Sequence, residues 1–95
     1  MMLSEKEIEA VWDMLRRLAK VYLVHFNFTY HKQLGSYKLT VCSGTREFTE
    51  YISETQIVDA TINSLRFIEM IARRMAEDLY SSYPHWAKVN PYVDK

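Results

Sequence analysis

The chain has 95 residues, of which 48% are hydrophobic and 14% aromatic, and its twelve basic residues balance its twelve acidic ones. A chain of this length forms one globular domain with a modest core. Because the net charge is zero, the composition excludes both a strongly basic nucleic-acid-binding protein and a strongly acidic mimic of DNA.

The first predicted element is a helix over residues 5–19. Ser4 and Glu7 form a capping box, in which each side chain accepts a hydrogen bond from the backbone N–H of the other residue. Apolar residues then recur at spacings of three and four, which predicts one buried helical stripe. The members of this stripe are Ile8, Val11, Trp12, Leu15, Leu18 and Ala19.

Strict alternation of apolar and polar side chains over residues 22–31 predicts a strand with one face on the core and an open second face. The apolar set is Tyr22, Val24, Phe26, Phe28 and Tyr30, and the polar set is His25, Asn27, Thr29 and His31. Part of the apolar set would also continue the first helix, which no Gly, Pro or Asn ends after Lys20. Aromatic and β-branched residues crowd this segment, however, and they favour a strand.

Two further strands are predicted after a turn at residues 32–36, in which Gly35 can take a positive φ. The second strand covers residues 37–42. It alternates between Tyr37, Leu39 and Val41 on one side and Lys38, Thr40 and Cys42 on the other. Residues 43–45 form another turn, and residues 46–52 form a third, less regular strand.

A single long helix is predicted after the strands. Ser53 and Gln56 form a second capping box at its start, and apolar residues at helical spacing extend it to about Tyr80. These apolar residues are Val58, Ile62, Leu65, Ile68, Ala72, Met75 and Leu79. Residues 83–95 contain two prolines and several aromatic residues, and they are predicted to form a C-terminal tail.

These elements predict an α+β fold in the order α-β-β-β-α, with residues 1–82 as the domain. Since each helix has one apolar stripe, both should cover one face of a three-stranded antiparallel meander. This order is similar to that of double-stranded-RNA-binding domains. Those domains have a basic cluster at the start of the last helix, where this chain has Glu54-Thr55-Gln56-Ile57-Val58-Asp59. The motif that would support the resemblance is therefore missing.

His25, His31 and Cys42 are residue types that bind zinc or form a cysteine–histidine nucleophile pair. They would lie near one another if the first two strands pair across the Gly35 turn. Their spacing matches no zinc motif, and a chain with two glycines offers little to build an oxyanion cradle. We therefore expect no metal, no cofactor and no catalytic activity.

The cellular compartment is predicted from the cysteine content and the N-terminus. A lone cysteine cannot form an intramolecular disulfide, which fits a reducing cytoplasm. The first residues lack the basic and apolar regions of a signal peptide, and no apolar run approaches the roughly 20 residues of a membrane span. We expect a cytoplasmic protein that makes no contact with membranes.

The sequence predicts a small non-catalytic binding module that occupies a surface of a macromolecular partner, with a protein favoured. Inhibitors and adaptors of phage or bacterial origin are often of this kind. The contact should involve the open sheet face and the aromatic tail. The expected partner-binding residues are His25, Asn27, Thr29, His31, Lys38, Thr40, Tyr83 and Trp86.

Nucleic-acid binding is the alternative, through stacking on the sheet and a basic cluster at the end of the first helix. The residues that would contribute are Arg16, Arg17, Lys20, Lys38 and Tyr51. Cations in the last turn of a helix also favour the helix dipole, which accounts for the cluster without any ligand.

A homodimer is also predicted, because the chain has more apolar side chain than so few elements readily bury. The near-heptad spacing of the long helix would suit pairing with a second copy, unless the stripe packs on the protein's own sheet. Its members are Thr61, Leu65, Ile68, Ala72, Met75 and Leu79.

Overall fold

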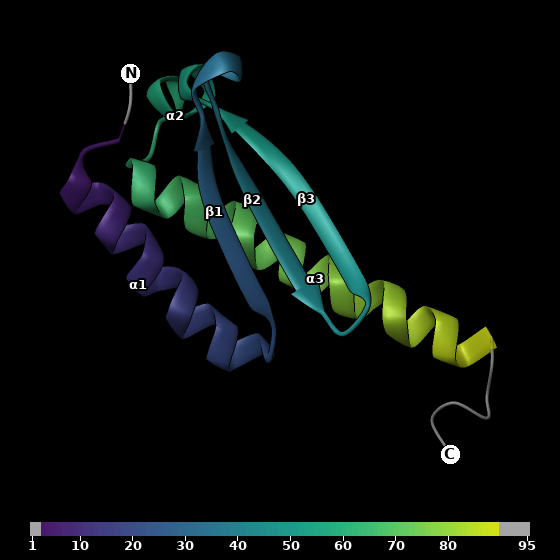
Figure 1. Ribbon diagram of the computed structural model, residues 1–95. Coiled ribbons are helices and arrows are strands. Elements are labelled where there is room, and N and C mark those ends of the chain that lie inside the picture. Colours follow the sequence, from purple (N-terminus) through teal and green to yellow (C-terminus); the bar gives the residue numbers. More distant parts are fainter. Residues whose placement is uncertain (1–2, 90–95) are drawn as a thin grey trace.

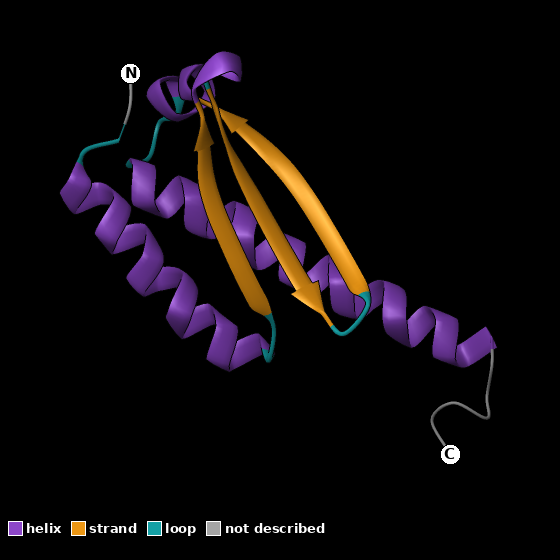
Figure 2. Ribbon diagram, in the orientation of Figure 1, coloured by secondary structure: helices purple, strands orange, loops and turns teal. Residues whose placement is uncertain are grey.

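A three-stranded antiparallel meander lies over two long helices in the computed structural model of the protein, which describes residues 3–89 and side chains as far as Tyr80 (Figure 1). The helices are α1 (Glu5–Tyr22), α2 (Glu54–Asp59) and α3 (Ser64–Val89), and the strands are β1 (His25–His31), β2 (Ser36–Ser43) and β3 (Arg46–Ser53). Figure 2 shows the strands crossing in front of α3. The predicted α+β fold is confirmed, with a short additional helix, α2.

Helix α1 begins as predicted. The Ser4 hydroxyl accepts a hydrogen bond from the Glu7 N–H at 3.2 Å, and the Glu7 carboxylate accepts one from the Ser4 N–H at 2.8 Å. The predicted capping box is therefore present. The apolar stripe that follows is buried in the core at Val11, Leu15 and Leu18.

The C-terminal end of α1 lies three residues beyond the predicted one. Leu23 takes a left-handed conformation with a φ of 57°, and the Val24 N–H donates to the Ala19 carbonyl at 3.1 Å. This bond is typical of a Schellman motif, in which glycine usually takes the left-handed position. Placing Tyr22 in the strand was wrong, because it is the last residue of α1 and its hydroxyl donates to Glu77 at 3.1 Å.

Replacing Leu23 with glycine is expected to raise the free energy of unfolding by about 1 kcal/mol. A non-glycine residue in the left-handed region costs roughly 1–2 kcal/mol. Leu23 is 75% exposed, so its removal sacrifices little burial. Urea denaturation would measure the gain, and Val21→Gly in the last turn of the same helix should instead destabilise by about 1 kcal/mol. A loss of stability in Leu23→Gly would contradict this account of the helix end.

The strands pair in a continuous register without a bulge. His25 lies opposite Cys42 and His31 opposite Ser36, while Ser43 lies opposite Arg46. Each connection depends on a glycine with positive φ, since Gly35 has a φ of 59° and Gly44 one of 61°. Gly44 is the first of the two residues that connect β2 to β3, and glycine at this position is typical of a type II′ hairpin turn.

The core fills the space between one face of the sheet and the two long helices. The sheet contributes the apolar residues that alternation predicted, and the side chains that are at most 4% exposed are Phe28, Tyr37, Leu39, Val41 and Ile52. Phe26 and Tyr30 share this face but are only partly buried. From α1 and α3 the core receives Val11, Met14, Leu15, Leu18, Ile68, Ala72, Met75 and Leu79.

One polar contact ties the start of α2 to the first strand. The Tyr30 hydroxyl donates to the Glu54 carboxylate at 2.6 Å. This bond raises the pKa of Tyr30 to about 12 and lowers the pKa of Glu54. The tyrosine is stabilised in its neutral form and the glutamate in its charged form. The contribution to folding stability is therefore lost in acid as Glu54 is protonated, and in strong base as Tyr30 ionises.

The long helix predicted after Ser53 is two helices. The capping box of Ser53 and Gln56 is present, with bonds of 2.8 and 3.0 Å, but it starts only the short α2. Ala60 then takes an extended conformation, and a second start follows at Asn63. The Asn63 side chain accepts from the Arg66 N–H at 2.8 Å, as an N-cap residue does.

Helix α3 continues to Val89, past the predicted end near Tyr80. Its stripe of Ile68, Ala72, Met75 and Leu79 is buried in the protein's own core. Of the two alternatives for this stripe, the structure therefore supports packing on the protein's own sheet, and the homodimer stays a prediction without that support. Of the predicted tail, the backbone as far as Val89 is helical, and residues 90–95 lie outside the described part of the chain.

Candidate functional site

One face of the sheet is covered by neither long helix, and we call it the open face. It is defined by ten of the side chains that the register places together on this side of the three strands, and it leaves out Ser36 and Ser53 at one end. The ten are His25, Asn27, Thr29 and His31 of β1, Lys38, Thr40 and Cys42 of β2, and Glu47, Thr49 and Tyr51 of β3. All ten are exposed or partly exposed, unlike the apolar residues that alternate with them in β2.

The centre of the open face is a row of small polar side chains. Asn27 lies opposite Thr40, which lies opposite Thr49, so the row crosses all three strands. The hydroxyls of Thr40 and Thr49 are 3.2 Å apart and share a hydrogen bond. These groups can still donate to and accept from a partner, because each hydroxyl has more than one hydrogen-bonding position.

One end of the open face carries two aromatic rings. The rings of His31 and Tyr51 meet edge to face across β2, with centroids 6.1 Å apart. The β2 residue opposite His31 is Ser36, whose small side chain leaves room for this contact. The Thr29 hydroxyl is 3.3 Å from Nε2 of His31. Tyr51 is half exposed, so this end offers a partner an accessible aromatic surface.

The structure brings six of the predicted partner-binding residues together. His25, Asn27, Thr29, His31, Lys38 and Thr40 all belong to the open face. The other two, Tyr83 and Trp86, are in α3, and their side chains lie outside the described part of the structure. Their role in binding, like that of the six, stays a prediction.

Most of the residues that β3 contributes to the open face were not predicted from the sequence. Glu47 and Thr49 complete two of its rows, opposite Cys42 and Thr40. The signal was weak because β3 alternates less regularly, with Glu50 rather than an apolar residue on the helix-facing side. Glu50 accepts from Arg74 of α3 at 2.6 Å, which explains how a carboxylate occupies that side.

The proposed cluster of His25, His31 and Cys42 does not form. His25 and Cys42 are directly opposite each other, but His31 lies at the other end of β1. The two histidines are six residue steps apart along the strand, which corresponds to about 20 Å. Among residues 3–80, whose side chains the structure describes, no group of three or more His, Cys, Asp or Glu side chains is placed to hold a metal ion.

The residues of the nucleic-acid alternative lie in two different layers. Lys38 and Tyr51 are neighbours on the open face, whereas Arg16, Arg17 and Lys20 belong to α1 in the helical layer. Arg16 is also paired with Asp13 at 2.7 Å, and both side chains are about two-thirds exposed. The two sets therefore do not combine into one basic surface.

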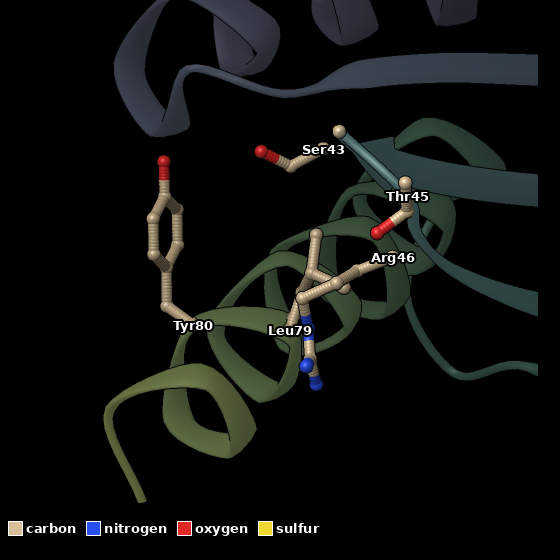
Figure 3. Close-up of a pocket in the computed structure, with 6 residues that line it drawn as sticks. Ser43, Thr45, Arg46, Leu79 and Tyr80 are labelled. Carbon is tan, nitrogen blue, oxygen red and sulfur yellow. The ribbon is translucent and has the colours of Figure 1, made fainter. Parts of the chain in front are cut away.

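A hollow of about 430 Å³ lies between the turn of β2 and β3 and helix α3 (Figure 3). Its lining is Ser43, Gly44, Thr45, Arg46, Leu79 and Tyr80. The Tyr80 ring stands across the hollow from Leu79, and its hydroxyl donates to the Tyr22 carbonyl of α1. Among the side chains that the structure describes, as far as Tyr80, this lining contains no histidine, cysteine or carboxylate.

Comparison with known proteins adds no assignment. No protein-family model matches the chain, and neither a curated protein nor a solved structure is significantly similar to it. None of the helices within residues 3–89 has both the length and the apolar character needed to cross a bilayer. A function can therefore be proposed only from the residues of the fold.

Proposed function

We propose that the protein is a small binding module that engages a protein partner through the open face. It would act as an inhibitor or adaptor by occupying a surface of that partner, without catalysing a reaction. The observation that carries this proposal is one face of polar and aromatic side chains, drawn from all three strands, that neither long helix covers.

The chemistry of the face favours a protein over a nucleic acid. Its charged side chains are Lys38 and Glu47, which have opposite signs. Binding to phosphates needs several uncompensated cations, because most of the affinity comes from releasing counterions. The exposed aromatic ring of Tyr51 instead favours a protein interface, where aromatic residues contribute much of the binding energy.

Thr40→Arg is expected to weaken binding of the partner at least about tenfold, because it places a long charged side chain at the centre of the face. Thr40 is the middle member of the row that Asn27 and Thr49 complete, so the variant leaves the core untouched. Glu9→Arg in α1 is a matched control, since Glu9 is exposed and lies on a helix behind the sheet. Isothermal titration calorimetry against the identified partner would measure both. Equal affinities for the two variants and the parent would place the contact elsewhere.

The partner must first be identified, and position 40 can also be used to identify it. A photo-crosslinking amino acid at position 40 should capture a protein from the native host that one at position 9 does not. The salt dependence of the affinity then distinguishes a protein partner from a nucleic acid. An interface with 6–10 phosphates would lose roughly 10³–10⁵ in affinity between 50 and 200 mM salt, whereas a largely uncharged protein interface would change little.

A further inference from the structure

The outer side of β1 carries no strand. The sheet order is β1-β2-β3, and β1 pairs with β2 without interruption from His25 to His31. In an antiparallel pair, alternate residues direct their N–H and C=O groups away from the neighbouring strand. Within residues 3–89, no turn or loop forms a backbone hydrogen bond to this side of β1. The edge therefore presents a row of backbone donors and acceptors.

The strand at this edge lacks three of the features that usually prevent a sheet from adding another strand. Protection normally comes from charged residues, prolines or bulges. β1 contains none of these, because its sequence is HFNFTYH and its register is continuous. The other edge, β3, carries Arg46, Glu47 and Glu50, and Glu50 is held by Arg74 of α3. The two edges of the sheet thus differ in their capacity to accept a strand.

A groove lies between α1 and the first two residues of β1. It is lined by Trp12, Leu15, Arg16 and Ala19 of α1 and by His25 and Phe26 of β1, and its volume is about 170 Å³. Figure 1 shows α1 on the side of β1 that is away from β2. The floor of the groove is largely apolar, and Trp12 and Phe26 remain partly exposed although they pack on the core. A strand added to β1 would lie over this floor.

We propose that β1 accepts an extended segment of the protein partner as a fourth strand of the sheet. This proposal rests on the proposed function, since the segment belongs to the partner that contacts the open face. Only another extended backbone matches a row of alternating N–H and C=O groups. Side chains on one face of the added segment enter the groove between Trp12 and Phe26, so every second residue of the segment near the groove is apolar. The residues between these apolar ones are polar and extend the open face.

The occupant is a single strand rather than a second copy of the chain. A second copy that paired through its own β1 would bring its own α1 to the same side of the edge. Because α1 already lies beside β1, the two helices would compete for one space. An isolated extended segment has no such helix.

The test uses the full chain and a displayed library of random octapeptides, from which a selected peptide is synthesised. The peptide is expected to show apolar residues at every second position. N-methylation of alternate residues should weaken binding at least about tenfold for the residues that face β1 and little for those between them. Ala19→Phe should fill the groove and cause a similar loss, whereas Arg17→Phe, at an exposed position of α1 outside the groove lining, should not.

Amide hydrogen exchange of the unmodified chain provides a second readout that does not depend on a variant. Bound peptide should slow exchange at alternate residues of β1. The proposal is overturned if bound peptide does not slow amide exchange in β1, if N-methylation of the peptide does not weaken its binding, or if the library yields no binder. It is also overturned if sedimentation shows that the chain forms a dimer and that Ala19→Phe abolishes this dimer. A peptide that is lost with Thr40→Arg and retained with Ala19→Phe would also overturn it, while leaving the proposed function intact.

Discussion

Tyr37→Ala is expected to lower the free energy of unfolding by about 3–5 kcal/mol, as truncation of a buried aromatic residue does. Tyr37 is 1% exposed, and its ring stacks on Phe28 with centroids 5.0 Å apart and an angle of 2°. A second ring, Tyr30, lies 4.8 Å away at 51°. Domains of this kind have total stabilities of about 5–15 kcal/mol, so the variant should lose much of its folded population. Urea denaturation followed by circular dichroism would measure the loss.

Tyr37→Phe distinguishes the contribution of the aromatic ring to stability from that of the hydroxyl. The Tyr37 hydroxyl accepts a hydrogen bond from the backbone N–H of Leu3 at 2.8 Å, and Leu3 is buried. Phenylalanine keeps the stacked ring but leaves that N–H without its acceptor, which should cost about 1–3 kcal/mol. If this variant were as unstable as Tyr37→Ala, the hydroxyl rather than the aromatic packing would be the larger contribution.

The sheet could be predicted well from sequence because its signal is fixed by backbone geometry. Side chains of a strand alternate between two faces, so one apolar list identifies the core side and the other list the open face. Leu39 and Thr40 illustrate the result, since neighbouring residues lie in the core and on the open face. The capping boxes were equally reliable, because each is a local exchange of hydrogen bonds between residues three apart.

Helix ends were harder to predict where the deciding conformation has no characteristic residue. Leu23 takes the left-handed position without being glycine, so nothing in the composition marks the end of α1. The break between α2 and α3 was hidden because Val58 and Ile62 continue the helical spacing, although they are 58% and 37% exposed. The available signal was Asn63, a residue type that commonly caps a helix.

The candidate site could be predicted in position but not in chemistry. Alternation placed His25 and Thr29 on the open face, whereas the residues of β2 and β3 that lie beside them depend on the register of the pairing. The groove beside β1 could not be foreseen at all, because it depends on where α1 packs relative to the strand edge. Such packing is decided by tertiary contacts that no local pattern records.

Leu39→Ala is expected to destabilise the protein by about 2–5 kcal/mol, while Thr40→Ala in the next position should cost less than about 1 kcal/mol. Leu39 is 0% exposed in the central strand, so truncation leaves a cavity between the sheet and the helices. Thr40 loses only the partly exposed hydroxyl bond to Thr49. Thermal and urea denaturation of the two variants would compare the two faces of one strand directly.

Similar losses for the two variants would mean that both faces of β2 are packed, which contradicts the open face.

The expected difference also has a consequence for binding. Because Thr40→Ala should keep the fold, any loss of affinity that it causes can be assigned to the interface. Combined with His25→Ala, whose side chain is exposed on the same face, it should weaken the partner's binding while the midpoint of urea unfolding stays near that of the parent. Leu39→Ala would weaken binding only through its lower folded population, and excess partner should restore it.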